Sequence, residues 1–152
     1  MALTATKFEK ASDSLGKGLI DFSADTFKVI LLASYTPSTS QTGHQFLSDV
    51  KGAGTEASGT GYTAGGATIA TVTWAWDTSN ARWELHGDIP AWDTTGGSLA
   101  GAYAVIYDAT PATDATRPVL AVWNLDGAGG TQTSSNGSFD LTESVDGLYY
   151  ID

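Results

Sequence analysis

The hydrophobic and polar positions of this chain alternate mostly with a period of two, which is the spacing of β-strands. In residues 82–89, one face would carry Trp83, Leu85 and Ile89, and the opposite, solvent-facing side would carry Arg82, Glu84, His86 and Asp88. Residues 68–76 alternate in the same way, with their three apolar aromatic or branched residues on one face, and residues 77–80 between the two runs are typical of a turn. The pattern predicts a β-hairpin with one wet face.

A second kind of pattern, a run that is β-branched or apolar at nearly every position, covers Thr26–Ala33. Such a run indicates a central strand that is covered on both faces. Further strands are expected at Leu99–Tyr107, Val119–Leu125, Gly137–Thr142 and Leu148–Ile151. We therefore predict a mainly β protein, built as a single β-sandwich of about seven or eight strands.

Helical spacing occurs at the N-terminus. Thr6–Glu9 fits a capping box, and Phe8, Ala11, Leu15 and Leu19 recur at intervals of three or four residues until Gly16 and Gly18 offer a stop. We expect an N-terminal helical segment at residues 1–24 and a β-sandwich domain at residues 25–152.

A long segment rich in Ser, Thr and Gly separates the first two predicted strands, from Ser34 to Gly66. Residues 44–50 within it are compatible with a short helix, and the rest is predicted to be loop. Loops of this length are usually functional or disordered, and in an assembly subunit a neighbour could order them. The glycines of residues 59–66 would allow positive φ and close approach to another surface, with Tyr62 as a buried anchor.

Composition and charge narrow the function. The 152 residues include 18 Gly and no Cys, charged residues make up 16%, and the net charge is −10. The absence of Cys excludes disulfides, thiolate catalysis and Cys-based zinc sites, and the acidic balance argues against binding nucleic acid. No run reaches the roughly 20 apolar residues of a membrane span and no secretory signal is evident, so we expect assembly in the host cytoplasm.

Candidate chemistry is sparse. A Ser-His-Asp triad would need His44 or His86, but no G-x-S-x-G elbow is present and both histidines stand among polar residues. The carboxylates do not follow an EF-hand pattern, and the glycine run at residues 59–66 lacks the Lys of a phosphate-binding loop. We expect no enzyme activity, no catalytic or metal-binding residues and no cofactor.

Five tryptophans could instead form a platform for sugars. Trp83 shares a face with Leu85, and Trp123 lies within an apolar run, so both are expected in the core. An exposed Trp92 would then be the main contact of a carbohydrate-binding or host-adsorption module.

Five segments in series resemble a family of small, β-rich structural proteins of tailed bacteriophages: Asp25–Leu32, Ser34–Pro37, His44–Val50, Glu56–Gly66 and Tyr103–Asp108. The resemblance implies a virion protein without catalytic residues. The chain departs from the family's pattern at Trp74–Trp92 and after Pro118.

From this resemblance and the composition we expect a capsid decoration or cement protein that stabilises the head at junctions between subunits of the major capsid protein. We expect a homo-oligomer, as a trimer, that contacts the major capsid protein or other virion subunits and neither nucleic acid nor membrane. A tail, neck or baseplate component is the alternative. The candidate partner-binding residues are Tyr35, His44, Phe46, Tyr62, Gly65, Gly66 and Trp92.

Overall fold

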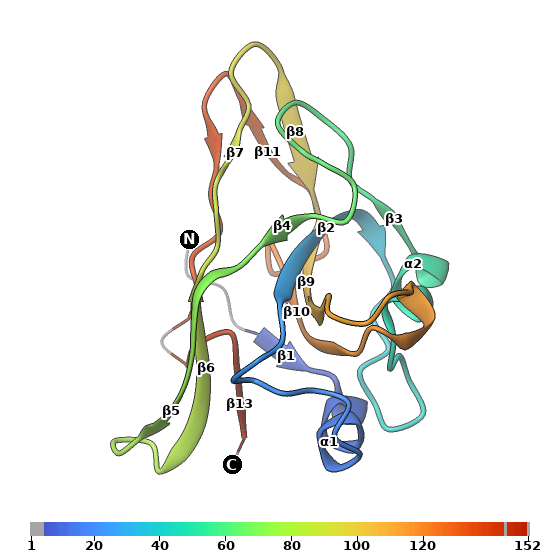
Figure 1. Cartoon of the computed structure of the whole chain (residues 1–152). Helices are drawn as coiled ribbons and strands as arrows, with labels where there is room; N and C mark the ends of the chain where they lie inside the picture. The colour runs from blue at the N-terminus through green and yellow to red at the C-terminus, as the bar shows by residue number, and fades with distance from the viewer. Residues whose placement is uncertain (1–4, 145, 152) are drawn as a thin grey trace.

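The computed structural model describes residues 5–144 and 146–151 and is mainly β, with 44% of residues in strands and 12% in helices (Figure 1). The elements are β1 (Ala5–Lys7), α1 (Glu9–Gly16), β2 (Phe27–Tyr35), α2 (Leu47–Ala53), β3 (Gly54–Glu56), β4 (Ala67–Thr68), β5 (Ala70–Asp77), β6 (Arg82–Asp88), β7 (Trp92–Asp93), β8 (Ser98–Gly101), β9 (Tyr103–Asp108), the 3-10 helix η1 (Asp114–Thr116), β10 (Val119–Asn124), β11 (Gln132–Ser135), β12 (Ser138–Phe139) and β13 (Tyr149–Ile151).

Within the described residues these strands form four antiparallel sheets. The largest has the order β1-β10-β9-β2-β3, with β4 also paired to β2, and β13-β6-β5 form a three-stranded sheet. Two short pairs, β11-β8 and β12-β7, lie at the upper end of Figure 1. The prediction of a mainly β chain is confirmed, whereas the arrangement of seven or eight strands in a single sandwich is not confirmed.

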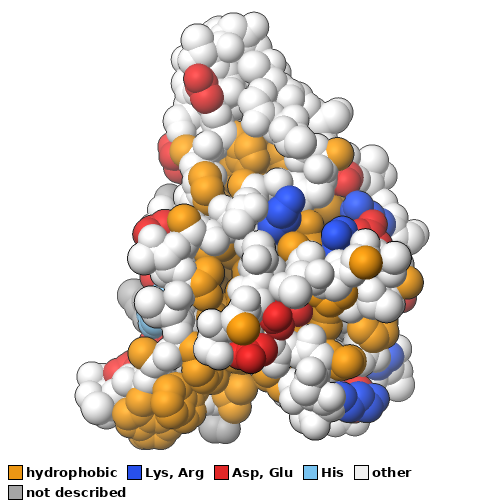
Figure 2. Space-filling model, in the orientation of Figure 1, with side chains coloured by type: hydrophobic (Ala, Val, Ile, Leu, Met, Phe, Trp, Pro, Cys, Tyr) orange, Lys and Arg blue, Asp and Glu red, His pale blue; other side chains and the backbone are white. Residues whose placement is uncertain are grey.

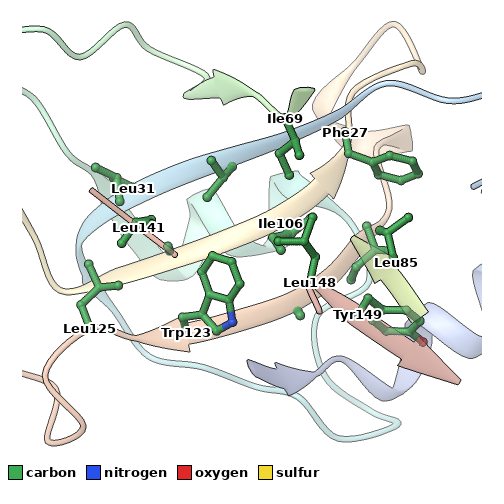
Figure 3. Packing of buried hydrophobic residues seen from close by; sticks show 14 of the residues in the cluster. Phe27, Leu31, Ile69, Leu85, Ile106, Trp123, Leu125, Leu141, Leu148 and Tyr149 are labelled. Carbon is green, nitrogen blue, oxygen red and sulfur yellow. The ribbon is translucent and has the colours of Figure 1, made fainter. Parts of the chain in front are cut away.

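Strand β2 divides the core in two. Alternate residues Phe27, Val29 and Leu31 belong to one buried cluster, and Ile30 and Leu32 belong to another on the opposite face. All five side chains are fully buried. Burying each of these side chains contributes roughly 2 kcal/mol to the stability of the fold, so this strand stabilises both clusters at once. The prediction of a central strand covered on both faces is confirmed. Figure 3 shows the cluster on the face of Phe27 and Leu31.

The N-terminal helix forms where it was predicted, but its start differs. Phe8 precedes the first turn as N-cap with an extended backbone and no capping side-chain hydrogen bond. Thr6, the expected cap, lies in β1 opposite Val122 of β10. The capping-box prediction is wrong because pairing with β10 holds this residue in a strand. The helix ends at Gly16, and Leu19 lies beyond it, exposed.

The segment from Ser34 to Gly66 is ordered by contacts within the chain. It contains α2, close to the short helix expected at residues 44–50, and β3, which pairs with β2. The carboxylate of Asp49 accepts hydrogen bonds from the backbone N–H groups of Gln45 and Phe46, at 3.0 and 2.9 Å, and so closes the first turn of α2.

The β5–β6 hairpin, residues 70–88, extends away from the main sheet at the lower left of Figure 1, and we call it the arm. Trp74 lies opposite Leu85, and Trp76 lies opposite Trp83, which confirms the predicted hairpin. The long strand expected at Leu99–Tyr107 is divided at Ala102. Its first part, β8, pairs with β11, whereas its second part, β9, lies inside the main sheet.

Candidate interaction surface

Three of the sequence-predicted contact residues lie around the start of α2. The hydroxyl of Tyr35 lies 2.6 Å from Nδ1 of His44, and the Tyr35 ring meets the edge of Tyr103 at 5.7 Å. Phe46 is the N-cap of α2 and forms a β-bridge with Pro118. Burial raises the pKa of the Tyr35 hydroxyl, and this ring is only 7% exposed. Tyr35 therefore serves packing within the chain more than contact with a partner.

The other four, Tyr62, Gly65, Gly66 and Trp92, come together beside β2. The hydroxyl of Tyr62 accepts a hydrogen bond from the backbone N–H of Leu31 at 3.1 Å and donates one to the carboxylate of Glu56 at 3.0 Å. The Tyr62 ring lies 6.0 Å from that of Trp92. The anchoring role expected of Tyr62 is confirmed.

The two glycines have the close-approach role expected of them. Gly65 and Gly66 both have positive φ, and the carbonyl oxygen of Gly65 accepts a hydrogen bond from the Tyr107 hydroxyl at 2.8 Å. A Cβ added to Gly66 would collide with the backbone of Val29. The surface that this loop approaches is therefore the chain's own strand β2.

Trp92 is only 4% exposed, so the expectation of an exposed Trp92 is wrong. Its ring meets Phe139 edge-on at 6.0 Å, because β7 pairs with β12 and turns the ring inward. A sugar or protein partner could not stack on it without opening this contact.

The exposed aromatic residues lie on the arm instead. Phe22 stacks on Trp74 at 4.3 Å, Trp74 stacks on Trp83 at 5.7 Å, and Trp83 meets Trp76 edge-on at 5.8 Å. Phe22 is buried and Trp74 is half-buried, so this column of four aromatic rings runs from the core outward to solvent. Each aromatic pair of this kind stabilises a fold by about 1 kcal/mol beyond its burial.

At the outer end of this column, Trp76 is 49% exposed and Trp83 is 43% exposed. Ile151 of β13, opposite Trp83 in the sheet, is also exposed. We call Trp74, Trp76, Trp83 and Ile151 the aromatic patch; Figure 2 shows apolar side chains gathered at the lower left, over the end of the arm. The expectation that Trp83 lies in the core is wrong, whereas Trp123 is fully buried as predicted.

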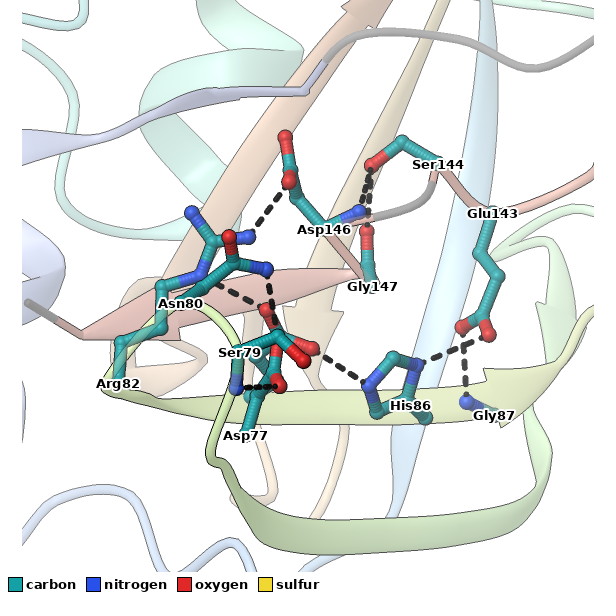
Figure 4. Close-up of polar contacts among 11 residues, drawn as sticks. Asp77, Ser79, Asn80, Arg82, His86, Gly87, Glu143, Ser144, Asp146 and Gly147 are labelled. Atoms are coloured by element: carbon teal, nitrogen blue, oxygen red, sulfur yellow. Dashed lines mark hydrogen bonds and ion pairs between the residues drawn. The ribbon is translucent and has the colours of Figure 1, made fainter.

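The opposite face of the arm carries a network of charges (Figure 4). The carboxylate of Glu84 accepts hydrogen bonds from Nε of Arg82 at 2.7 Å and from Nε2 of His86 at 2.9 Å. Nδ1 of His86 lies 3.0 Å from Glu143, and Arg82 also pairs with Asp146. Glu143 and Asp146 thereby cover part of this face, and Glu84 is only 3% exposed. The prediction of a wholly solvent-facing side is wrong for Glu84.

His86 lies between two carboxylates. Burial lowers the pKa of His86, but the hydrogen bonds and the negative charges of Glu143 and Glu84 outweigh it, and the pKa is raised above its usual value. Only the protonated ring can donate to both carboxylates at once. The network therefore holds the C-terminal segment against the arm most firmly while His86 is charged.

A separate buried acid ends β9. Burial raises the pKa of Asp108 to about 6, assisted by the nearby charge of Asp25 and opposed by hydrogen bonds from Thr110. Asp108 is fully buried, and its Oδ2 has no donor among the described residues. The backbone N–H of Thr110 donates a hydrogen bond to Oδ1 of Asp108 at 2.8 Å, so this carboxyl closes the turn after the strand.

Two observations bear on possible metal and ligand sites. Among the described residues no three His, Cys, Asp or Glu side chains gather in a way that could hold a metal ion. A surface groove of about 310 Å³ between β11 and β12 is lined by Leu125, Gln132, Thr133, Ser134, Ser138, Phe139, Asp140 and Leu141. That lining includes a single acid and no base, so it offers no acid–base pair.

In the part of the chain that the structure describes, no helix is both long and apolar enough to cross a membrane. No protein-family model, no curated protein and no solved structure matches this chain.

Proposed function

We propose that this chain is a non-enzymatic structural subunit of a tailed-bacteriophage virion, and that it acts as a capsid decoration or cement protein. The observation that carries the proposal is the aromatic patch, because it places two half-exposed tryptophans at the end of a projecting arm. Large apolar side chains gathered on a surface usually mark a site that another protein covers. The resemblance of five sequence segments to phage structural proteins supports the same function.

The size of the patch fits one contact within an assembly. A buried Trp removes roughly 200 Å² from water, so covering the exposed halves of Trp76 and Trp83 would contribute about 5 kcal/mol. Association alone costs about 4–15 kcal/mol. The patch is therefore too small to hold a free partner tightly, but it suffices where a neighbouring subunit makes further contacts.

The partner that we propose is the major capsid protein or another virion subunit, with the chain itself as a homo-oligomer in the particle. With a net charge of −10, the surface would repel nucleic acid and anionic membranes. The same patch would serve a tail, neck or baseplate component, which is the alternative position in the virion. We propose that assembly takes place in the host cytoplasm. We also propose that the sheets group as one sandwich.

A carbohydrate-binding or host-adsorption module is the second candidate, and exposed Trp76 and Trp83 are the observation that favours it. Sugars stack on exposed aromatic faces. The two rings meet at 69°, so they do not form one flat platform. Binding of host polysaccharide that quenches tryptophan fluorescence, and that is lost in Trp76→Ser, would favour this candidate.

Addition of purified protein to preformed capsids that lack it tests the main proposal. We expect the protein to bind and to raise the temperature at which capsids open. Trp76→Ser should weaken binding, whereas Leu19→Ser, which removes a comparably exposed apolar side chain outside the arm, should not. Recovery only on isolated tails would support the tail alternative. Absence from every part of the particle would contradict the virion proposal.

A further inference from the structure

One edge of the arm's sheet is open. In the order β13-β6-β5, strand β5 pairs with β6 on one side, and no described strand pairs with its other side. Edge strands usually carry a Lys, a Pro or a bulge that prevents pairing with another chain. Strand β5 contains no Lys and no proline, and its single charged residue is Asp77 at its end.

The first part of β5 is protected by an irregularity, and the second part is not. The register with β6 shifts between Ala70 and Thr73, and Thr71 has a φ of 50°. A bulge of this kind bends the strand and disrupts pairing. Residues 73–77 pair regularly with β6 and leave a regular, open edge of five residues.

We propose that two copies of this chain pair through these edges, antiparallel and around a two-fold axis, with Ala75 opposite Ala75 of the second copy. The pairing rests on the proposed structural role and names one of its partners. It would join two three-stranded sheets into one six-stranded sheet across the axis.

The sequence of the edge favours this register. Centring on Ala75 pairs all five regular residues, and it places Trp74 opposite Trp76 of the second copy on the same face. A shift of one residue would turn the tryptophans of the two copies to opposite faces. Centring on Trp74 instead would place Asp77 against Thr71, where the bulge interrupts the edge.

Charge also permits the pairing. In the proposed register Asp77 lies opposite Thr73 of the second copy, so the acids of the two edges do not face each other. The net charge of −10 on each copy still opposes approach at long range. Salt screens that repulsion, so self-association should strengthen as the salt concentration rises.

Sedimentation velocity of the full chain over a range of concentrations tests the pairing. We expect a monomer–dimer equilibrium and increased protection of backbone amides in residues 73–77 as the dimer forms. A two-fold pair differs in mass from the trimer expected from the sequence. A chain that stays monomeric at every concentration, or that forms only trimers, would overturn the proposal.

Two substitutions at exposed Thr73 test the register. Thr73→Lys would place a cation opposite Asp77 of the second copy, twice per dimer, and Thr73→Asp would place an anion there. Cross-strand charge pairs predict dimerisation about twofold to thirtyfold tighter for the first and weaker by a similar factor for the second. Within its own chain Thr73 lies opposite His86. An Asp at position 73 would attract the protonated ring of His86, and a Lys there would repel it. Thr73→Lys should therefore tighten dimerisation and lower the stability of the monomer, and Thr73→Asp should do the reverse.

Ser79→Lys and Ser79→Asp provide matched controls, because Ser79 lies in the turn outside the paired edge and they change the net charge equally. Equal effects at residues 73 and 79 would overturn the register, since net charge alone would explain them. Glycan binding at Trp76 by a chain that does not self-associate would overturn the pairing as well. Capsid binding without self-association would leave the proposed function intact and remove only this inference.

Discussion

Replacing Tyr62 by Phe should destabilise the protein although it removes a single oxygen atom. The hydroxyl satisfies the backbone N–H of fully buried Leu31 and donates to Glu56, which also accepts from the backbone of Gly65. Leaving a buried donor without a partner costs about 1–3 kcal/mol. Glu56 keeps its bond to Gly65, so the N–H of Leu31 dominates, and we expect a loss of about 2 kcal/mol in the free energy of unfolding.

Urea unfolding followed by tryptophan fluorescence measures this loss, and hydrogen exchange locates it. Tyr150→Phe is the matched control, because the contacts described for Tyr150 are made by its ring, which lies beneath the charges of Lys7 and Arg82 at 3.8 and 4.0 Å. Its change should stay within about 0.5 kcal/mol. Equal values for the two variants would refute the reasoning and would mean that Tyr62 does not hold the glycine-rich loop to β2.

Three further measurements address other parts of the chain. The pKa of His86 is raised on folding, so its contribution to the stability of the protein should be complete below about pH 6.5 and should be lost as the pH rises through the pKa of His86 in the folded protein. His86→Gln should abolish this pH dependence of the thermal unfolding temperature. The pKa of Asp108 is raised to about 6, so between about pH 4 and pH 6 this carboxyl ionises more readily in the unfolded chain than in the folded one. The wild type should therefore lose stability relative to Asp108→Asn over this pH range, as measured by equilibrium unfolding titrations. Gly66→Ala, with positive φ and a collision with Val29, should cost about 3 kcal/mol or more in urea unfolding, whereas Gly16→Ala, with open space around it, should be neutral or slightly stabilising.

The sequence predicted those strands whose hydrophobic pattern directly reflects which of their faces are buried. The run around Val29 could be recognised as a strand covered on both sides, because apolar residues occupy both faces from Val29 to Leu32 and Lys28 is the single charged residue of β2. Alternation in residues 68–76 and 82–89 gave the hairpin and assigned Trp74 and Trp76 to one side. Tyr62 was recognisable as an anchor because one large aromatic residue stands among glycines.

Features that depend on tertiary pairing could not be predicted in this way. Three residues of β1 are too few to display a period, and a local match to a capping box concealed the pairing of Thr6 with Val122. Periodicity assigns a side chain to a face but does not show how far the core extends along it. For that reason Trp83 was expected to be buried and Trp92 to be exposed, and the structure reverses both.

The arm offers a partner one face and one edge that can be covered without breaking contacts inside the chain. Its polar face is closed by the ion pairs of buried Glu84, and opening them would leave a charge without its partners. On the other side the sheet ends at β13, where Tyr150 of this strand and Phe8 and Glu9 of the same chain line one surface groove. The aromatic face and the β5 edge meet at Trp74 and Trp76, so a neighbour that binds there would gain apolar burial and backbone hydrogen bonds together. If assembly instead used the polar face, Glu143→Gln would impair it more than Trp76→Ser does.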